Sequence, residues 1–366
     1  MEITLSAIKA DIGSIAGHTK PTPEVLAAVE NTIKNQRGLL LIDYYIGHCG
    51  DDIHLLITHT RGINNKEIHE LAWNAFVAGT AVAKEQGLYG AGQDLLKDAF
   101  SGNVRGLGPG VAEMQIKERG SEVIILFVAD KTEPGAYNLP FYKMFVDPDF
   151  NSGLILKPSI QKGFTFTVMD VDNTDGDKVI ELATPEELYK LATLLRDNNR
   201  FVVEKIHSRH SGEIVAVSST SRLHNIAGKY VGKDDPVALV RAQGDFPATE
   251  EICKVFRIAH YVTGDTRGSH TMPLMPSKRN MHATSYFCIP MVSSLGFQVK
   301  NGKLCGPIDL FDDPYWDQVR KKACLKADLI REQGWSGAAM ASKTELAYTA
   351  IQETMDELEK RFVVRK

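Results

Sequence analysis

The sequence predicts an α+β protein in which sheets and helices are stacked as a layered sandwich. Segments with strand character and segments with helical periodicity are mixed without the strict βαβ rhythm of a parallel sheet. No proline- or serine-rich linker, low-complexity run or internal repeat divides the chain, although 366 residues would allow two or three domains. Hydrophobic residues make up 43% and charged residues 24%, as in a globular protein with a large core. We therefore expect one domain over residues 1–366, with antiparallel or mixed sheets covered by helices.

The N-terminal elements are the most regular part of the pattern. Residues 3–9 alternate between apolar and polar side chains and predict a strand. Residues 23–36 predict a helix, and two strands are expected over 39–46 and 53–59. An alanine-rich helix is expected over 65–86, and a glycine follows each of the two helices closely.

The rest of the chain continues the same mixture. Residues 123–129 form a strongly apolar segment that predicts a buried strand. A hairpin is expected around Asn-Thr-Asp-Gly-Asp, which separates two short apolar runs. The predicted elements that remain are the hairpin strands over 164–170 and 179–182, strands over 202–206, 213–218 and within 283–299, and helices over 185–197, 316–333 and 345–362.

Charge and composition exclude several classes of protein. The formal net charge is −4 and the isoelectric point about 6.3, with no basic stripe interleaved with aromatic residues, so nucleic acid is not an expected partner. No run of 18 apolar residues predicts a membrane span, and the N-terminus does not resemble a signal peptide. Five scattered cysteines without a Cys-x-x-Cys pair indicate a reducing cytoplasm.

Aspartates recur where predicted strands begin or end. Asp11 follows the first strand, Asp51 and Asp52 precede another, and Asp130 closes the apolar strand at 123–129. Carboxylates at strand ends can meet at one rim of a sheet, and several of them, with an amide such as Gln93, suit Mg²⁺. The alternative for each single aspartate is an ordinary turn residue.

The loop at 227–237 combines a lysine, two carboxylates and a phenol between glycines. A nucleophilic Lys233 must be uncharged to attack a carbonyl, yet Asp234 and Asp235 beside it favour the ammonium form. Divalent cations on these aspartates would remove the conflict, because they offset the carboxylate charge. Tyr230 could then transfer protons as an acid or base. The alternative is a surface turn with a Lys–Asp ion pair.

Three further motifs suggest sites only weakly. The glycine-rich run 101–110 could offer backbone N–H groups to a phosphate, but its spacing does not match a dinucleotide fingerprint and a simple turn fits equally well. Residues 170–181 resemble a calcium loop with its glycine one position late, so we interpret them as a hairpin turn. His207 and His210 lack a third soft ligand, which favours a solvated turn over zinc.

The chain resembles the archaeal-type fructose 1,6-bisphosphate aldolase/phosphatase family over nearly its whole length. The stretches that carry the resemblance occur in the family's order. They are Ile8-Lys-Ala-Asp-Ile-Gly-Ser with Gly17-His18, Gly50-Asp-Asp-Ile-His-Leu, Gly87-Leu-Tyr-Gly-Ala-Gly-Gln-Asp-Leu-Leu, Phe100-Ser-Gly-Asn-Val-Arg-Gly, Ala129-Asp-Lys-Thr-Glu-Pro-Gly-Ala, Ala227-Gly-Lys-Tyr-Val-Gly-Lys-Asp-Asp-Pro, Arg267-Gly-Ser-His and Leu346-Ala-Tyr-Thr.

The resemblance implies one bifunctional active site in a single four-layer α-β-β-α sandwich that assembles as an octamer. Such a site condenses dihydroxyacetone phosphate with glyceraldehyde 3-phosphate to fructose 1,6-bisphosphate. It then removes the 1-phosphate to give fructose 6-phosphate, a gluconeogenic step that uses several Mg²⁺ ions. A cytoplasmic enzyme that binds sugar phosphates is therefore expected.

The resemblance also assigns roles to individual residues. Lys233 matches the Schiff-base lysine and Tyr230 the proton donor and acceptor of the aldol step. Positions that match metal ligands are Asp11, Asp51, Asp52, Gln93, Asp130, Asp234 and Asp235. Positions that match substrate contacts are His18, Tyr89, Gly102, Asn103, Lys131, Gln243, Arg267 and Tyr348.

One position departs from the family pattern. The family carries Asp-Gly where this chain has Cys288-Ile289, and cysteine is a poor ligand for Mg²⁺. This departure leaves open the choice between the bifunctional enzyme and a Mg²⁺-dependent sugar phosphatase with lost or altered aldolase activity. A third alternative is a non-catalytic relative that binds sugar phosphates. The retention of Tyr230, Lys233 and the paired aspartates argues against the non-catalytic relative.

Overall fold

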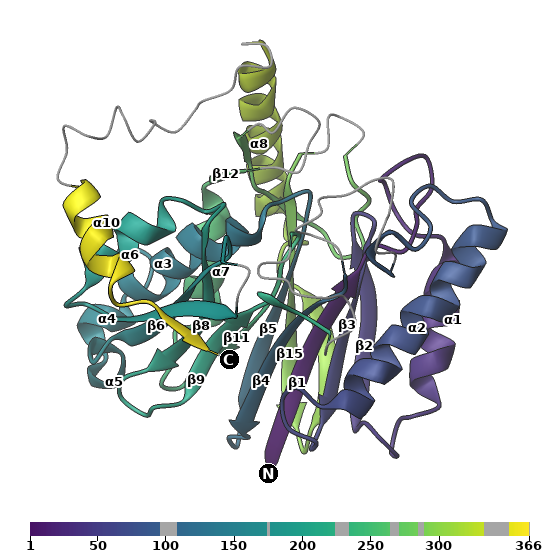
Figure 1. Cartoon of the computed structure of the whole chain (residues 1–366), viewed down its shortest axis with the longest axis horizontal. Coiled ribbons are helices and arrows are strands. Elements are labelled where there is room, and N and C mark those ends of the chain that lie inside the picture. The colour runs from purple at the N-terminus through teal and green to yellow at the C-terminus, as the bar shows by residue number, and fades with distance from the viewer. Residues whose placement is uncertain are drawn as a thin grey trace.

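Two β-sheets lie face to face, and helices cover their outer faces (Figure 1). The computed structural model describes residues 1–95, 108–173, 176–223, 234–263, 271–284, 289–332 and 351–365. The mixture of helices with mainly antiparallel strands confirms the predicted α+β class. Within the described part of the chain, no helix is both long and apolar enough to cross a membrane.

The first sheet has five strands and is covered by two long helices. The helix α1 (Pro23–Lys34) begins at Thr22, whose side chain accepts a hydrogen bond from the Val25 N–H group. The helix α2 (Lys66–Glu85) begins at Asn65 in the same way. The order of the strands is β10 (Ser221–Arg222), β4 (Gly110–Lys117), β1 (Glu2–Ala10), β3 (Asp52–His59) and β2 (Asp43–Cys49).

The second sheet is larger, and β5 lies inside it between two antiparallel neighbours. The order of its strands is β14 (Met275–Ser277), β15 (Met291–Lys300), β5 (Glu122–Asp130), β11 (Val237–Ala242), β9 (Ile214–Ser218), β8 (Phe201–Ser208), β6 (Phe164–Asp170), β7 (Asp177–Ala183) and β17 (Val363–Arg365), with β16 (Lys303–Asp309) also paired to β15. A separate pair joins β12 (Tyr261–Thr263) to β13 (Thr271–Pro273).

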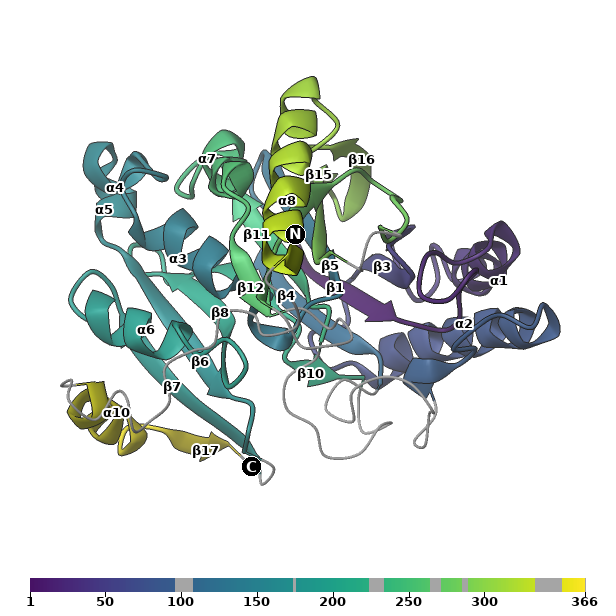
Figure 2. The same ribbon diagram turned by 90° about the horizontal axis from the view of Figure 1, so that it is seen from above.

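Most of the remaining helices cover the outer face of the second sheet. Figure 2 shows α10 and β17 beside α6 and β7, on the opposite side of the molecule from α1 and α2. The helices other than α1 and α2 are α3 (Asn138–Val146), α4 (Gly153–Leu156), α5 (Pro158–Gln161), α6 (Leu188–Leu195), α7 (Thr249–Lys254), α8 (Pro314–Glu332), which projects beyond the sheets at the top of Figure 1, and α10 (Ile351–Glu359). The 3-10 turns are η1 (Gln93–Leu95), η2 (Pro134–Tyr137) and η3 (Val255–Arg257).

Alternate side chains of β1 point into two different cores. Ile8 packs with residues of α1 and α2 on the outer face of the first sheet. Leu5 and Ala7 pack between the two sheets, in a core that also contains Leu126 of β5. Because every second strand residue faces the same way, Lys9 also points between the sheets. A third core fills the space between the second sheet and its own helices.

The structure corrects several element boundaries. The strand expected over 39–46 is β2 at Asp43–Cys49, because Gly38 turns the chain and leaves Leu39 75% exposed. Within 283–299 the strand begins at Met291. The prediction missed β4, β11, β16 and α3. The expected hairpin of β6 and β7 is confirmed. The Asp170 carboxylate forms ion pairs with Arg200 and Lys178, which agrees with a hairpin turn rather than a calcium loop.

Candidate active site

The ends of strands from both sheets bring the predicted aspartates together. In the first sheet, the pairing of Ala10 with Ile53 places Asp11 beside Asp52. In the second sheet, Val237 pairs with Val128, and the Ala129 N–H group donates to the Pro236 carbonyl at 3.2 Å. This pairing leads directly to Asp235 and Asp130 at the same edge. The predicted convergence of carboxylates therefore occurs across two sheets rather than at the rim of one.

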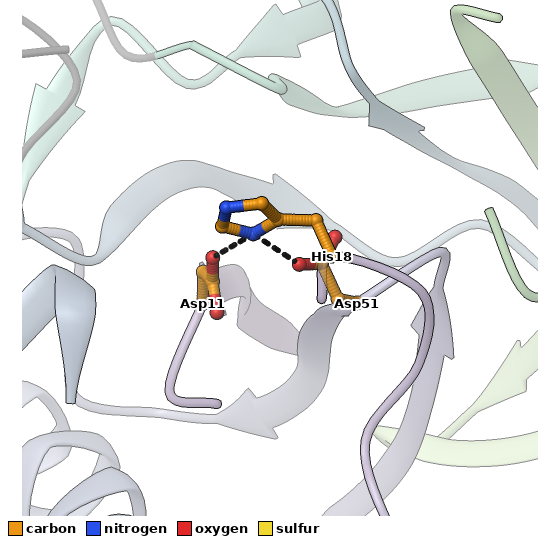
Figure 3. Close-up of side chains that lie close together, drawn as sticks. All are labelled: Asp11, His18 and Asp51. Atoms are coloured by element: carbon orange, nitrogen blue, oxygen red, sulfur yellow. Dashed lines mark hydrogen bonds and ion pairs between the residues drawn. The ribbon is translucent and has the colours of Figure 1, made fainter. Parts of the chain in front are cut away.

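The first cluster, which we name the outer group, consists of Asp11, His18 and Asp51 (Figure 3). The Nδ1 atom of His18 lies 2.9 Å from Asp51 Oδ2 and 3.7 Å from Asp11 Oδ2. Both carboxylates are buried, while the His18 side chain is 32% exposed. The imidazole therefore lies over the two carboxylates on the side that solvent can reach.

The second cluster, which we name the inner group, consists of Asp52, Asp130 and Asp235, all buried. Each offers an oxygen within 4.8 Å of the others. Asp235 Oδ1 accepts a hydrogen bond from the Thr132 N–H group at 2.6 Å. Asp130 Oδ2 is buried without a hydrogen-bond partner among the described residues. The inner group thus contains a carboxylate oxygen that is available to a cation.

Two buried lysines lie among these carboxylates. Lys131, in a left-handed conformation with φ 62°, places its Nζ atom 2.8 Å from Asp130 Oδ1 and also bonds Asp51 Oδ1. Lys131 therefore connects the outer group to the inner group. Lys9 Nζ lies 2.6 Å from Asp52 Oδ2 and 3.7 Å from Asp235 Oδ2.

Burial and charge determine the protonation of the cluster. Burial raises the pKa of Asp52 and of Asp130 well above the ordinary value, and the neighbouring lysines offset this only in part. Burial acts in the same direction on Asp51, but Lys131 and His18 outweigh it and hold the pKa of Asp51 well below its usual range. The carboxylates of Asp11 and Asp51 raise the pKa of His18 to about 10.

The donor set fits a hard divalent cation. Carboxylate oxygens are the ligands that Mg²⁺ prefers, and buried carboxylates with raised pKa values gain from a cation between them. The unpartnered Oδ2 of Asp130 supplies a specific ligand atom. Gly50 makes room for this oxygen, because a β carbon at residue 50 would collide with it. The residues present are therefore compatible with metal binding in both groups.

A family model described as fructose-1,6-bisphosphatase matches residues 2–363. The chain belongs to this family. Similar proteins named fructose-1,6-bisphosphate aldolase/phosphatase include one from Thermus thermophilus, 57% identical over 99% of this chain and 100% of the relative. Another, from Cenarchaeum symbiosum, is 51% identical over 100% of this chain and 96% of the relative. A third, from Sulfurisphaera tokodaii, is 50% identical over 99% and 94%.

Three more residues expected from the family resemblance lie beside these clusters. Tyr89 contacts His18 edge to face, with ring centroids 4.9 Å apart. Gln93 is the first residue of η1, and its side chain lies close to Gly90. If Gly90 carried a β carbon, that carbon would lie 3.1 Å from Gln93 Oε1. The same β carbon would lie 3.9 Å from His18, so the Gln93 side chain is close to the outer group. Asp234 is buried next to Asp235, and its charge acts on Lys9.

Gln243 lies at the other end of β11 from Asp235. The six residues of β11, at about 3.3 Å each, separate them by about 20 Å. Gln243 is exposed, with φ 66°, and its carbonyl accepts a hydrogen bond from Arg119 Nη1 at 2.9 Å. Within one chain, the structure does not bring Gln243 to the carboxylates.

The remaining predicted residues fall outside the part of the chain that the structure describes. They are Tyr230, Lys233, Gly102, Asn103, Arg267, Tyr348 and Cys288. Their roles stay predictions.

The structure also adds residues that the sequence analysis did not assign. Lys9 neutralises the inner group, and Asp94 Oδ2 accepts a hydrogen bond from the Asp11 N–H group at 2.8 Å. Thr132 holds Asp235 through its backbone. Lys9 alone left a signal in the sequence, because a charged residue stands on the face of β1 that Leu5 and Ala7 fill with apolar side chains.

Proposed function

We propose that this chain is a bifunctional enzyme of gluconeogenesis. It condenses dihydroxyacetone phosphate with glyceraldehyde 3-phosphate to fructose 1,6-bisphosphate, and then hydrolyses the 1-phosphate to release fructose 6-phosphate. The observation that carries this proposal is the pair of adjoining buried carboxylate clusters, connected by Lys131, in a member of the fructose-1,6-bisphosphatase family. A site with this much buried negative charge suits metal-assisted chemistry on a phosphate ester.

We assign metal binding to Asp11, Asp51, Asp52, Gln93, Asp130, Asp234 and Asp235, with several Mg²⁺ ions as the cofactor. Bound Mg²⁺ would polarise the 1-phosphate and offset the negative charge that grows as its ester bond breaks. The chain itself must hold the carboxylates apart, and the backbone supports this by clamping Asp235 to Thr132 and Asp11 to Asp94.

Cationic groups of the chain would orient the phosphate. His18 is exposed on one side, and with a pKa near 10 it is cationic at neutral pH in the metal-free protein. Lys131 adds a second positive charge between the two groups. Tyr89, packed against the His18 ring, would fix the imidazole and offer its phenol to the sugar. We assign Gly102, Asn103, Arg267 and Tyr348 to substrate binding from the family resemblance alone.

Lys233 and Tyr230 would carry the carbon–carbon chemistry. The neutral Lys233 amine attacks the ketone carbon of dihydroxyacetone phosphate and expels water to form an imine. Tyr230 removes a proton from the adjacent carbon to give an enamine, which attacks the aldehyde of glyceraldehyde 3-phosphate. Tyr230 returns the proton to the new alkoxide, and water releases the product and regenerates the amine. Hydrolysis of the 1-phosphate follows in the same site.

Cys288 favours a second candidate, a Mg²⁺-dependent sugar phosphatase with lost or altered aldolase activity. A soft thiol stands where the family pattern has a hard carboxylate. The carboxylates of the inner group, which suit phosphate chemistry, are all present. A non-catalytic sugar-phosphate-binding relative fits less well, because Lys233, Tyr230 and the carboxylates are all retained.

We propose a homo-octamer in the cytoplasm, acting as one catalytic domain over residues 1–366. The position of Gln243 supports an assembly, because a substrate contact from Gln243 requires its presentation to a site in another copy of the chain. Hydrogen bonds hold the 243–247 turn in place. The Arg119 guanidinium bonds the carbonyls of Ala242 and Gln243, and Gln243 and Pro247 are joined by a backbone hydrogen bond.

The test is to incubate the purified protein with both triose phosphates and Mg²⁺, and to follow fructose 6-phosphate and phosphate together. The bifunctional enzyme releases both products at equal rates. Excess chelator should stop phosphate release, and added Mg²⁺ should restore it. Phosphate release only from supplied fructose 1,6-bisphosphate would favour the phosphatase, and full turnover in chelator would contradict the metal assignment.

A further inference from the structure

Lys9 is a buried ammonium group inside a cluster of carboxylates. Its side chain is 1% exposed and lies 2.6 Å from Asp52 Oδ2 and 3.7 Å from Asp235 Oδ2. Asp52 belongs to the first sheet, whereas Asp235 leads into β11 of the second. One side chain of β1 therefore joins the carboxylates of two sheets.

The position of Lys9 is unfavourable for a lysine unless the carboxylates need it. It points between the sheets, on the same face of β1 as Leu5 and Ala7, where an apolar side chain would add to the core. Burying a charge there is costly unless it is paired at close range. The fold alone would therefore be served better by an apolar residue, and the ammonium must act on the inner group.

The lysines occupy oxygens that cations would otherwise bind. Lys9 contacts Asp52 Oδ2 and Asp235 Oδ2, and Lys131 contacts Asp130 Oδ1. The Thr132 N–H group takes Asp235 Oδ1. Among the described residues, Asp130 Oδ2 is the inner-group oxygen left buried without a partner. The inner group is thus already partly neutralised, with Asp130 Oδ2 as an open ligand atom.

We propose that Lys9 takes the place of one divalent cation in the inner group. Its ammonium is a permanent counter-charge that holds Asp52 against Asp235 across the two sheets. It reduces by one the number of ions that the inner group binds. Lys9 is in this sense a positioning residue, and the inference rests on the proposed metal binding at this site.

The test compares wild type with Lys9→Met, which keeps an unbranched side chain one atom shorter and removes its charge. Bound Mn²⁺ per chain is counted by equilibrium titration with electron paramagnetic resonance, and thermal unfolding is recorded in chelator and in Mg²⁺. We expect Lys9→Met to bind one more ion than wild type. We also expect its melting temperature to fall by several degrees in chelator and to be largely restored by Mg²⁺.

Lys178→Met is the matched control, because Lys178 also pairs with two carboxylates, Asp170 and Glu359, far from the site. Its loss should lower the melting temperature equally with and without Mg²⁺. An unchanged Mn²⁺ count in Lys9→Met, an equal loss of stability in both conditions, or failure to fold even in Mg²⁺ would overturn the proposal. Absence of Mn²⁺ binding in wild type would instead contradict the metal assignment itself.

Discussion

Gly50 lies directly against the carboxylate of Asp130: a β carbon at residue 50 would fall 1.5 Å from Asp130 Oδ2. Gly50 also has φ 56°, in the region that side chains disfavour. It belongs to the turn between β2 and β3 that carries Asp51, so the two sheets touch here through a glycine and an aspartate. The absence of a side chain at this position is therefore a requirement of the inner group.

Gly50→Ala should displace Asp130 and impair metal-dependent phosphate release by roughly tenfold or more, since about 1.4 kcal/mol already corresponds to tenfold. Gly87→Ala is the control, because Gly87 has φ 65° and a β carbon there would meet no atom of the described residues within 4 Å. Both variants bear the backbone penalty of about 1 kcal/mol, but only Gly50→Ala meets the carboxylate. Equal Mg²⁺-dependent activity in the two variants would show that Asp130 can move without consequence.

Lys233→Arg should separate the two reactions. Arginine stays protonated and cannot form the imine, so condensation of the triose phosphates should fall to background. Hydrolysis of supplied fructose 1,6-bisphosphate should persist. Borohydride with dihydroxyacetone phosphate should trap an adduct on wild type and none on the variant, as read by mass spectrometry. An adduct on another lysine would show that Lys233 is not the nucleophile.

Gln243 leads to a prediction about mixed assemblies. If Gln243 serves a site in a partner copy, Gln243→Ala and Asp235→Ala should each be weakly active alone. When the two variants are coexpressed, some sites of the mixed assemblies should contain an intact Asp235 from one copy and an intact Gln243 from another copy. For random pairing, about a quarter of the sites are complete, so about a quarter of wild-type activity should return. Activity no greater than the mean of the single variants would indicate that sites are not shared.

Cys288→Asp should raise aldolase activity if the hard ligand is what the site lacks. The substitution is best made alone. Ile289 is fully buried with Met272, Met275 and Ala323, so shortening Ile289 to glycine would leave a cavity and cost several kcal/mol, on the order of 2–5. Parallel assays of both reactions give the outcome. If wild type already performs both and Cys288→Asp changes neither, the departure from the family pattern has no catalytic meaning.

His260 predicts a loss of stability in acid. Burial lowers the pKa of His260 to about 3, against about 6.5 when unfolded, so the unfolded chain binds the extra proton below pH 6.5. Stability therefore falls as pH decreases from 6.5 towards 3. His260→Leu should lose less free energy of unfolding between pH 7 and 4.5 than wild type, by on the order of 1–3 kcal/mol.

Urea denaturation at the two pH values measures this difference. The exposed His210 provides the control, because His210→Leu removes a histidine from the surface and leaves the buried His260 in place. An identical pH dependence in all three proteins would show that His260 is not the group that titrates.

Local patterns predicted much of the fold. The alternation in β1, the capped helices α1 and α2, and the apolar β5 are all visible in the sequence because neighbours in the chain determine them. The strand β11 was missed because its six residues include Arg241, whose burial depends on Glu122 and on Glu213 of distant segments. No local pattern reveals such a pairing.

The convergence of the carboxylates was predicted, but their division into two groups across two sheets was not. Sequence shows that Asp52 and Asp130 lie at strand ends, yet only the pairing of strands within each sheet and the packing between sheets places them in one group. The contacts of Lys9 and Lys131 could not be predicted from the sequence either. Lys131 was expected to contact substrate, whereas its bonds to Asp51 and Asp130 depend on three-dimensional position.

The inner group takes Asp52 from one sheet and Asp130 with Asp235 from the other, so its dimensions follow the separation of the sheets. Leu5, Leu56 and Leu126 belong to the core that fills the space between the sheets, so their volumes contribute to that separation. A single methylene gained or lost there would shift the ligand oxygens relative to each other, and ion selectivity depends on shifts of a few tenths of an ångström. Substitution at these leucines is therefore expected to change the metal preference of the inner group without any change in its carboxylates.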